Sequence, residues 1–306
     1  MLTCDDYLSP ATLDEAFDAM AANAGRYRLV AGATDILPWA REGRAGDVHI
    51  PVMIDIAGIP ELNTREVASG KVRLGAATRF QRFLDDPALT KAMPVMPRCA
   101  VWFADDQIRE SATIGGNLVN GSPAADGTPA LLALDANVVL AAKRDGKIIR
   151  RKLPLAKFAL GPGKTAIEPD EILLEIECDA LPGHGGAFEK VGHRRSLVIS
   201  TACVAALIEI DAKTSTIRDV RLACAGIGPV PQRMEALEAG LKGKPLSESV
   251  LGQAAFAAPD FVASRTRQDY RREVVRGFVL RALINAARRA GAGHKQISSE
   301  FEAAHV

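Results

Sequence analysis

Apolar residues recur at helical spacing near the start of the chain. Four of them stand three or four positions apart: Leu13, Phe17, Met20 and Ala24. A capping box at 12–15 (TLDE) precedes this run and Gly25 stops it, so the pattern predicts a helix. The next apolar run, 28–31, predicts a strand that leads directly into a glycine-containing loop. The opening unit is therefore expected to be a helix, a strand and a loop.

Short apolar or alternating runs predict further strands before the middle of the chain. They lie at 53–56, 72–76, 131–140 and 171–176. Asp145-Gly146 predicts a tight hairpin turn after the third of these runs. Thr78 is expected to cap a short helix that ends at Leu84. Residues 95–106 are predicted to be helical, with an interruption at Pro97.

A Pro/Gly cluster at 181–186 (LPGHGG) separates two patterned regions. Beyond it, the runs at 204–210 and 217–224 predict a pair of antiparallel strands. A helix is expected to begin at 231–233, and a long amphipathic helix to run from Tyr270 to Ala287. The mixed order of strands and helices predicts an α+β chain.

The same boundaries predict the domain organisation. We expect a first domain over residues 1–182, with lobes of about 1–56 and 57–182. A C-terminal domain is expected over 183–290, followed by a tail over 291–306. From His294 onward the tail is expected to be mobile.

Composition and charge exclude several classes of protein. The 306 residues carry a formal net charge of +1, without the basic excess typical of nucleic-acid binders. The first residues do not form a signal peptide, and no apolar run approaches the ~20 residues that span a bilayer. We therefore expect no membrane insertion and a cytoplasmic protein. The five cysteines include no C-x-x-C pair, which argues against an iron–sulfur cluster in this chain. His184 and His193 lack a second ligand at metal spacing, so no metal site is expected.

Two glycine loops carry the candidate chemistry. One is 112–117 (ATIGGN), with 122–126 (SPAAD) close behind it, and the other is 30–35 (VAGATD). Glycine permits positive φ and close approach of a ligand to bare N–H groups, and consecutive N–H groups that point one way bind anions. The two loops together make a dinucleotide the leading candidate, while a structural turn is the alternative for the double glycine. The segment 161–164 (GPGK) lacks the spacing of a Walker motif and is interpreted as an ordinary turn.

With both loops placed, the chain resembles the FAD-binding medium subunits of molybdenum hydroxylases. That group includes the flavoprotein subunits of carbon monoxide dehydrogenase and bacterial xanthine dehydrogenase. The segment 31–36 (AGATDI) looks like the family's AGGTDL loop, and 108–117 (IRESATIGGN) looks like its IRxxATxGGN signature. Further matching segments follow in the family's order at 54–56, 60–62, 74–78, 122–126, 131–136, 171–173, 190, 194–195, 226, 231–233 and 270–271. The resemblance covers about Tyr7 to Ala287.

The resemblance implies the fold and the site. The fold would be a two-lobed FAD-binding domain of the vanillyl-alcohol-oxidase/PCMH type, followed by a smaller C-terminal domain with an antiparallel sheet and helices. The first loop would surround the FAD diphosphate with Ala31, Gly32, Ala33, Thr34, Asp35 and Ile36. The second loop would take the other side with Thr113, Gly116, Asn117 and Ser122, and Asp126 would accept a hydrogen bond from the cofactor. The apolar lining would be Phe103, Ala104, Ile108 and Ala112. Leu173 and Lys190 would contact the flavin side, and Ile199 would lie against the isoalloxazine ring.

Three positions depart from the family's pattern. Ala33 replaces the second glycine of the first loop, which restricts φ there. Glu110-Ser111 follows Arg109 where the family often has Asn. The stretch 196–198 (SLV) lacks the acidic residue found in the xanthine-oxidising members, and a missing carboxylate near the flavin changes its reduction potential or its acceptor. NAD is therefore not carried over as the electron acceptor.

The resemblance also implies the role of the chain. A separate large subunit would carry the molybdenum cofactor, and a small subunit would carry two [2Fe–2S] clusters, in a dimer of heterotrimers. FAD in this chain would take electrons from the clusters and pass them to an external acceptor, so no catalytic residue is expected here. Two alternatives stay open: a stand-alone FAD-dependent oxidoreductase, and a non-flavin scaffold subunit of the same fold.

Several side chains have more than one interpretation from sequence. Asp126 can cap the helix that follows it, alone or while binding the cofactor. Lys190 can be a surface lysine, and Arg194 and Arg195 either form salt bridges or face a partner. A group of later arginines is most simply a solvated helix face, and alternatively docks to an acidic partner. This group contains Arg265, Arg267, Arg271, Arg272, Arg276 and Arg281.

Overall fold

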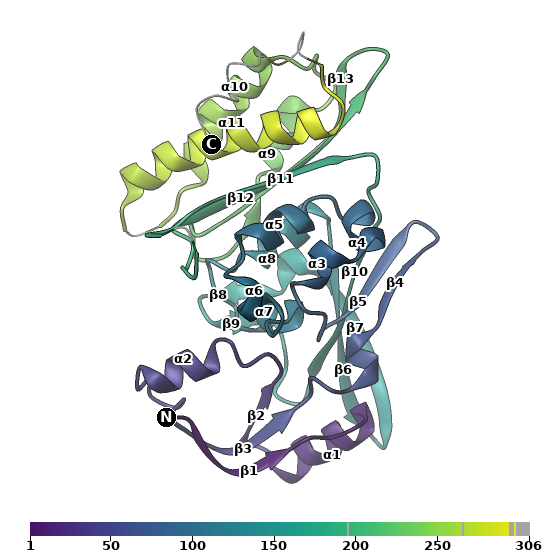
Figure 1. Ribbon diagram of the computed structural model, residues 1–306, viewed down its shortest axis with the longest axis vertical. Coiled ribbons are helices and arrows are strands. Elements are labelled where there is room, and N and C mark those ends of the chain that lie inside the picture. The colour runs from purple at the N-terminus through teal and green to yellow at the C-terminus, as the bar shows by residue number, and fades with distance from the viewer. Residues whose placement is uncertain (195, 265, 294–296, 298–306) are drawn as a thin grey trace.

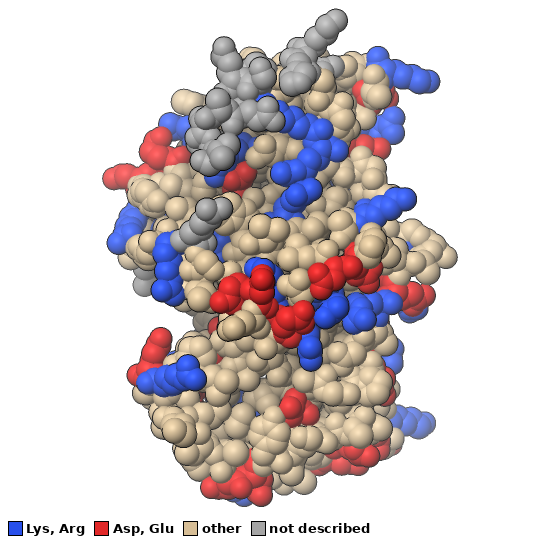
Figure 2. Space-filling model, viewed as in Figure 1, with Lys and Arg blue, Asp and Glu red and all other residues tan. Residues whose placement is uncertain are grey.

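The computed structural model describes residues 1–194, 196–264, 266–293 and 297. Three tiers follow one another along its long axis: a small N-terminal lobe, a larger middle lobe and a C-terminal domain (Figure 1). Within the described residues, no helix is both long enough and apolar enough to cross a membrane. Acidic and basic side chains are interleaved across the middle of the face in Figure 2, so this face carries no field of a single sign.

The N-terminal lobe is a three-stranded parallel sheet with two helices. Its elements are β1 (Thr3–Leu8), α1 (Leu13–Ala22), β2 (Tyr27–Val30), α2 (Ile36–Arg41) and β3 (His49–Asp55). β3 lies between β1 and β2. The predicted Thr12 cap is present, because the Glu15 N–H donates to Thr12 Oγ1 at 3.2 Å. The Glu15 carboxylate accepts from the Ala11 N–H at 2.7 Å, one residue before the N–H that a capping box uses. The first helix is thus confirmed, whereas β1, an edge strand with mostly exposed residues, carried no apolar pattern to predict it.

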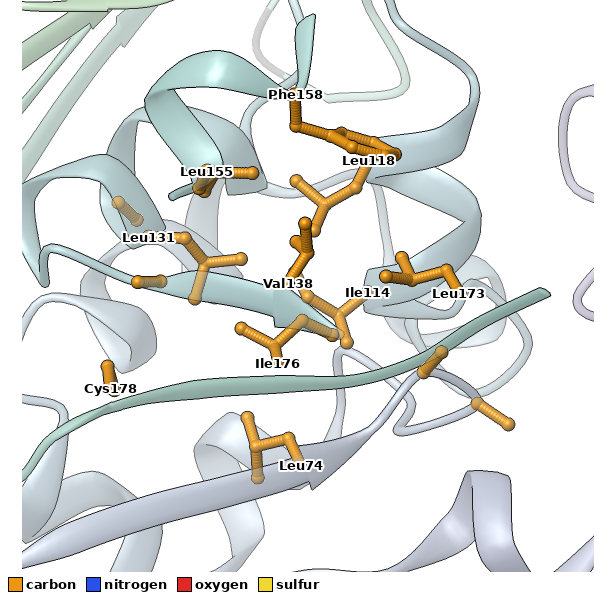
Figure 3. Packing of buried hydrophobic residues seen from close by; sticks show 14 of the residues in the cluster. Leu74, Ile114, Leu118, Leu131, Val138, Leu155, Phe158, Leu173, Ile176 and Cys178 are labelled. Atoms are coloured by element: carbon orange, nitrogen blue, oxygen red, sulfur yellow. The ribbon is translucent and has the colours of Figure 1, made fainter. Parts of the chain in front are cut away.

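The middle lobe packs short helices against an antiparallel sheet. Its elements are η1 (Pro60–Asn63), β4 (Arg65–Ala68), β5 (Lys71–Gly75), α3 (Arg82–Asp85), α4 (Pro87–Ala92), α5 (Met96–Trp102), α6 (Asp106–Arg109), α7 (Ile114–Val119), α8 (Gly127–Ala133), β6 (Asn137–Arg144), β7 (Lys147–Pro154), η2 (Leu155–Lys157), β8 (Ala159–Gly161), β9 (Lys164–Thr165) and β10 (Ile172–Asp179). The larger sheet has the order β4-β5-β10-β6-β7. Its core joins Leu74, Val138 and Ile176 of the sheet to Ile114 and Leu131 of α7 and α8 (Figure 3).

Three predictions in this lobe are wrong in detail. The apolar run 131–140 is the end of α8 followed by β6, because a short apolar run fits a buried helix end as well as a strand. Pro97 lies in the first turn of α5, where a missing N–H costs nothing, and does not interrupt it. Thr78 caps no helix: α3 begins at Arg82, and among the described residues the buried Thr78 hydroxyl has no partner. The hairpin turn at Asp145-Gly146 and the ordinary turn within 161–164 are confirmed.

The C-terminal domain is an antiparallel sheet covered by helices. Its elements are β11 (Gly185–Val191), β12 (Ala202–Asp211), β13 (Thr216–Ala225), β14 (Gln232–Arg233), α9 (Glu235–Leu241), α10 (Glu248–Ala257), η3 (Ala258–Phe261) and α11 (Gln268–Arg289). The predicted strand pair and long helix are confirmed. The predicted helix start at 231–233 is wrong, because these residues extend the sheet as β14. Apart from residue 297, the tail from His294 lies outside the described residues.

β12 is buried on both faces, which explains its continuous apolar sequence. Val204, Ala206 and Ile208 pack in the core of the C-terminal domain, under α11. Cys203 and Ala205 alternate with them and pack in the core of the middle lobe, where α5 and α8 approach the sheet (Figure 1). The two parts of the chain therefore share one strand as a common wall.

Candidate cofactor site

The first glycine loop connects the end of β2 to α2. Among the described residues, no backbone carbonyl accepts from the N–H groups of Gly32, Ala33, Thr34 or Asp35. Ala33 has φ of 53°, a left-handed conformation that disfavours a side chain. The sequence anticipated a restricted φ at this alanine, and the structure holds it in the conformation for which glycine is best suited. The loop presents a run of N–H donors that have no partner in the described part of the chain.

The fold brings the first loop against the start of the second. A Cβ placed on Gly32 would overlap the carbonyl oxygen of Ser111 and lie 2.8 Å from its carbonyl carbon. The same atom would lie 3.0 Å from the Cα of Ala112. Residues 32 and 112, far apart in sequence, are therefore in backbone contact, and only glycine permits it at position 32.

The double glycine forms the first turn of α7, and the expectation of positive φ and free N–H groups there is wrong. Neither Gly115 nor Gly116 is among the residues with positive φ. The Gly115 N–H donates to Ala76 O at 2.8 Å, and the Gly116 N–H donates to Thr113 Oγ1 at 3.1 Å. Gly115 is buried against Ala76, whereas Gly116 is exposed and a Cβ there would meet only the Thr113 hydroxyl, at 2.9 Å. Gly116 thus contributes an open surface rather than donors.

Asn117 and Ser122 each accept a hydrogen bond within the protein and retain donor groups for a ligand. Asn117 Oδ1 accepts from the Gly127 N–H at 3.1 Å, which fixes the start of α8. Ser122 Oγ accepts from the Ala124 N–H at 3.3 Å. Each side chain is used as an acceptor, so the Asn117 Nδ2 group and the Ser122 O–H stay available as donors to a ligand.

The segment 103–112, which contains the predicted apolar lining, is held by an arginine to which the sequence assigned no role. Arg109 is buried and donates to Phe103 O at 2.9 Å and to Gln81 Oε1 at 3.2 Å. Phe103 stacks on Phe80 with ring centroids 3.8 Å apart. Ala104 has φ of 46°, and Ile108 and Ala112 pack beside the core. The sequence indicated Arg109 only as part of the 108–117 signature, because the neighbouring residues do not show that it binds the carbonyl group of Phe103.

Asp126 lies in a buried cluster between the two domains. Lys190 Nζ donates to one of its oxygens at 2.5 Å, and the Ser200 hydroxyl donates to the other, also at 2.5 Å. Lys190 also donates to Trp102 O at 3.2 Å. The interpretation of Asp126 as a helix cap is wrong, because its side chain makes no capping bond at α8. The interpretation of Lys190 as a surface lysine is also wrong, because its side chain is only 3% exposed. Burial raises the pKa of Asp126, and Lys190 opposes that shift. Ser200 gave no signal in the sequence.

Ile199 and Leu173 occupy opposite environments. Ile199 is 77% exposed, an unusual state for a large aliphatic side chain beside a buried cluster. Leu173 is 3% exposed and lies in the core of the middle lobe, next to Ile114 and Val138 (Figure 3). Ile199 is therefore open to a ligand, whereas the Leu173 side chain is enclosed in the core.

The arginines divide into structural and exposed groups. Arg194 donates to Leu197 O within its own loop, at 2.9 Å through Nε. Arg271 donates to the carbonyls of Thr201 and Gly226, and Arg281 pairs with the buried Glu189 at 2.5 Å. Arg267 and Arg272 are exposed. Arg195 and Arg265 lie outside the described residues.

A hollow on the surface of the middle lobe is separate from this site. It measures about 440 Å³, lies on the sheet of the middle lobe, and shares no lining residue with the glycine loops. Its charged side chains pair with one another, as Lys152 does with Glu177 and Lys71 does with Asp179. In the described part of the chain, no group of three His, Cys, Asp or Glu side chains is placed to hold a metal ion.

Comparison with known proteins identifies the family. Residues 3–178 match the FAD binding domain in molybdopterin dehydrogenase, and residues 187–286 match the CO dehydrogenase flavoprotein C-terminal domain. The chain belongs to the family of FAD-binding medium subunits of molybdenum hydroxylases. Its fold is that of the carbon monoxide dehydrogenase medium chain, and its C-terminal domain is of the same flavoprotein type.

Relatives match this family member over almost their whole length. It is 29% identical over 292 residues to the xanthine dehydrogenase FAD-binding subunit of Escherichia coli O157:H7, covering 93% of this chain and 97% of that protein. It is 29% identical over 254 residues to the carbon monoxide dehydrogenase medium chain of Hydrogenophaga pseudoflava, covering 83% and 85%. The solved carbon monoxide dehydrogenase of H. pseudoflava, which lacks the Mo-pyranopterin moiety, superposes with a TM-score of 0.85 at 28% identity, covering 94% of this chain and 99% of that one.

The residues of this medium subunit fit FAD. Unpartnered N–H groups over Gly32–Asp35 suit the oxygens of a diphosphate. Gly116 leaves open backbone where a side chain would stand, and Asn117 and Ser122 retain donors for polar groups. The exposed Ile199 suits the face of an apolar ring.

Proposed function

We propose that this oxidoreductase subunit carries FAD between its two glycine loops and transfers electrons from a [2Fe–2S] subunit to an external acceptor. The observation that carries the proposal is the backbone contact between Gly32 and Ser111, because it joins the loop with unpartnered donors, among the described residues, to the start of the loop that contains Gly116. When bound, FAD supplies a ring that can take up and release electrons singly or in pairs.

The chain's own residues would bind, orient and shield this group. The N–H groups over 32–35 donate to the diphosphate, and the remaining donors of Asn117 and Ser122 bind polar groups of the nucleotide. Ile199 covers the flavin ring and excludes water from it. The lower local dielectric constant then affects how strongly the charge of the ring is stabilised when its oxidation state changes. In this proposal the chemistry on the substrate belongs to the large subunit, and the residues of this chain bind and shield the flavin.

We further propose partners and a location for the subunit. A large subunit with the molybdenum cofactor and a small subunit with two [2Fe–2S] clusters would supply the electrons, in a dimer of heterotrimers. Medium chains of such multi-subunit enzymes match this chain nearly end to end, which supports the division of labour. A cytoplasmic location agrees with five free cysteines, four of them buried, as is usual in a reducing compartment.

Cofactor release tests the FAD proposal directly. The purified chain, or its native complex, is precipitated with acid or heat, and the supernatant is examined by absorption and mass spectrometry. We expect a yellow supernatant that contains one equivalent of FAD. Flavin retained on the pellet, FMN, or a colourless protein would contradict the proposal and favour a scaffold subunit.

Metal analysis of the native complex tests the subunit assignment. Size-exclusion chromatography followed by elemental analysis is expected to show iron and molybdenum co-eluting with this chain. The chain expressed alone is expected to pass electrons from an artificial donor to a dye only weakly. A metal-free homo-oligomer with full substrate activity would show that it is a stand-alone flavoenzyme.

A further inference from the structure

Residues 192–194 and 196–200, called here the 192–200 loop, lie between β11 and β12, and the two ends of this loop are tied together. The Thr201 N–H donates to Val191 O at 2.7 Å, which closes the loop at its base. Inside it, Gly192 lies so close to Val198 that an added Cβ would be 2.9 Å from Val198 Cγ2. The loop therefore leaves the sheet and returns to it at nearly the same point.

One carboxylate in the other domain holds both ends of this loop. Lys190, just before the loop, donates to Asp126 Oδ2, and Ser200, its last residue, donates to Asp126 Oδ1. A third contact lies further along, where Ser196 Oγ donates to Ala104 O at 2.8 Å. Each of the three contacts crosses from the C-terminal domain to the middle lobe, so the loop is fixed to the lobe that bears the glycine loops.

Ser200 and Ile199 are neighbours with opposite exposure. The Ser200 hydroxyl is buried in the bond to Asp126, whereas Ile199 is 77% exposed. Because the two residues are consecutive in the chain, the bond that holds Ser200 inward also restricts where the backbone can place Ile199. The position of Ile199 therefore depends on a carboxylate that it does not touch.

We propose that Asp126 positions the 192–200 loop by holding Lys190 and Ser200, and so sets Ile199 against the flavin ring. This rests on the proposed function, in which FAD lies beside Ile199. Lys190 and Ser200 are positioning residues in this scheme, because the bonds of both side chains are directed to Asp126 and, for Lys190, also to Trp102 O. Loss of either bond removes one link between this part of the C-terminal domain and the middle lobe, while the sheet on both sides persists.

The test compares Ser200→Ala and Lys190→Met with a matched control, Glu189→Gln. Glu189 precedes Lys190 on β11 and forms a similarly buried ion pair with Arg281, but that pair lies wholly within the C-terminal domain. Two measurements are made on the full chain: the rate of trypsin cleavage after Arg194, mapped by mass spectrometry, and the affinity and midpoint potential of bound FAD. The double variant Asp126→Asn/Lys190→Met removes both charges and so avoids leaving one buried charge unpaired.

We expect Ser200→Ala to raise both the cleavage rate and the dissociation constant of FAD about tenfold, and to shift the FAD midpoint potential. Lys190→Met is expected to do the same with a lower yield of folded protein. The double variant is expected to recover the yield while the loop stays cleavable. Glu189→Gln is expected to change neither measurement.

Wild-type cleavage and wild-type FAD properties in Ser200→Ala would overturn the inference. Equal effects in Glu189→Gln would overturn it as well, because the loop would then respond to any loss of stability on β11. If the wild-type chain binds no FAD, the proposed function fails, and the cleavage rates alone decide whether Asp126 holds the loop.

Discussion

Gly32 lies directly against the carbonyl group of Ser111, with no room for a side chain between the two glycine loops. A methyl group at this position must push apart backbone on both sides, and backbone cannot move as a flexible side chain does. The contact is thus a structural requirement for the site and a way to test where the cofactor lies.

Gly32→Ala is expected to reduce the free energy of unfolding by about 1–3 kcal/mol, the usual effect of overpacking, and to abolish FAD binding. Chemical denaturation and released FAD measure the two effects. Gly58→Ala is the matched control, because a Cβ on Gly58 meets nothing within 4 Å. Full FAD content in Gly32→Ala would mean that the contact between the loops does not shape the site.

Ala33→Gly is expected to stabilise the chain. Ala33 has φ of 53°, and an alanine in this left-handed conformation destabilises the folded state by about 1–2 kcal/mol. Glycine removes this cost, but its greater freedom in the unfolded chain lowers the stability by about 0.4–1 kcal/mol. The net gain in unfolding free energy is about 0.5 kcal/mol by this reasoning. Ala21→Gly, at an exposed position in the last turn of α1, is the control and is expected to lose stability, by at most about 0.5–1 kcal/mol. Denaturation curves that show equal losses for both variants would contradict the argument.

Local patterns predicted those parts of the fold that local forces decide. The helix cap at Thr12 and the apolar runs at 204–210 and 217–224 are readable because each residue's role depends on neighbours a few positions away. The run 131–140 was misassigned because both a helix end and a strand bury such residues completely. Thr78 was misassigned because a capping residue and an unpartnered buried hydroxyl look identical in sequence.

The site was predictable as a set of segments and not as a set of contacts. The glycine loops and the resemblance they carry indicated which residues gather, but the bond between Lys190 and Asp126 joins residues 64 positions apart. Ser200 bears no motif at all. The free N–H groups lie in the first loop rather than at the double glycine, because α7 forms there and uses the N–H groups of both glycines within the protein.

Asp219 is expected to make stability depend on acid pH. Burial raises the pKa of Asp219, but hydrogen bonds from His184 and Arg221 more than offset this and hold it at about 2. The folded-state pKa is thus depressed below the ordinary ~3.9, and the ionised form stabilises the fold. This contribution, about 2 kcal/mol, is fully present above pH ~4 and is lost as the pH falls toward 2.

Asp219→Asn should therefore be less stable than wild type at neutral pH and converge with it near pH 2. Urea denaturation at several pH values measures the difference. Asp6→Asn, at an exposed position on β1, is the control and should follow the wild-type curve. A constant difference between Asp219→Asn and wild type across the whole pH range would show that the carboxylate stabilises by packing alone.

Gly115 and Gly116 are adjacent, and we expect their substitution to have opposite consequences. A Cβ on Gly115 would lie 2.6 Å from both the Cβ and the carbonyl oxygen of Ala76, so Gly115→Ala should damage the fold. A Cβ on Gly116 meets only the Thr113 hydroxyl, and Gly116 is exposed, so Gly116→Val should leave the fold largely intact while its side chain fills the surface proposed for the cofactor. Circular dichroism and released FAD, measured on both variants, separate the two effects. Full flavin content in a folded Gly116→Val would show that FAD does not lie against this turn, because the valine side chain would fill the space that the proposal gives to the cofactor.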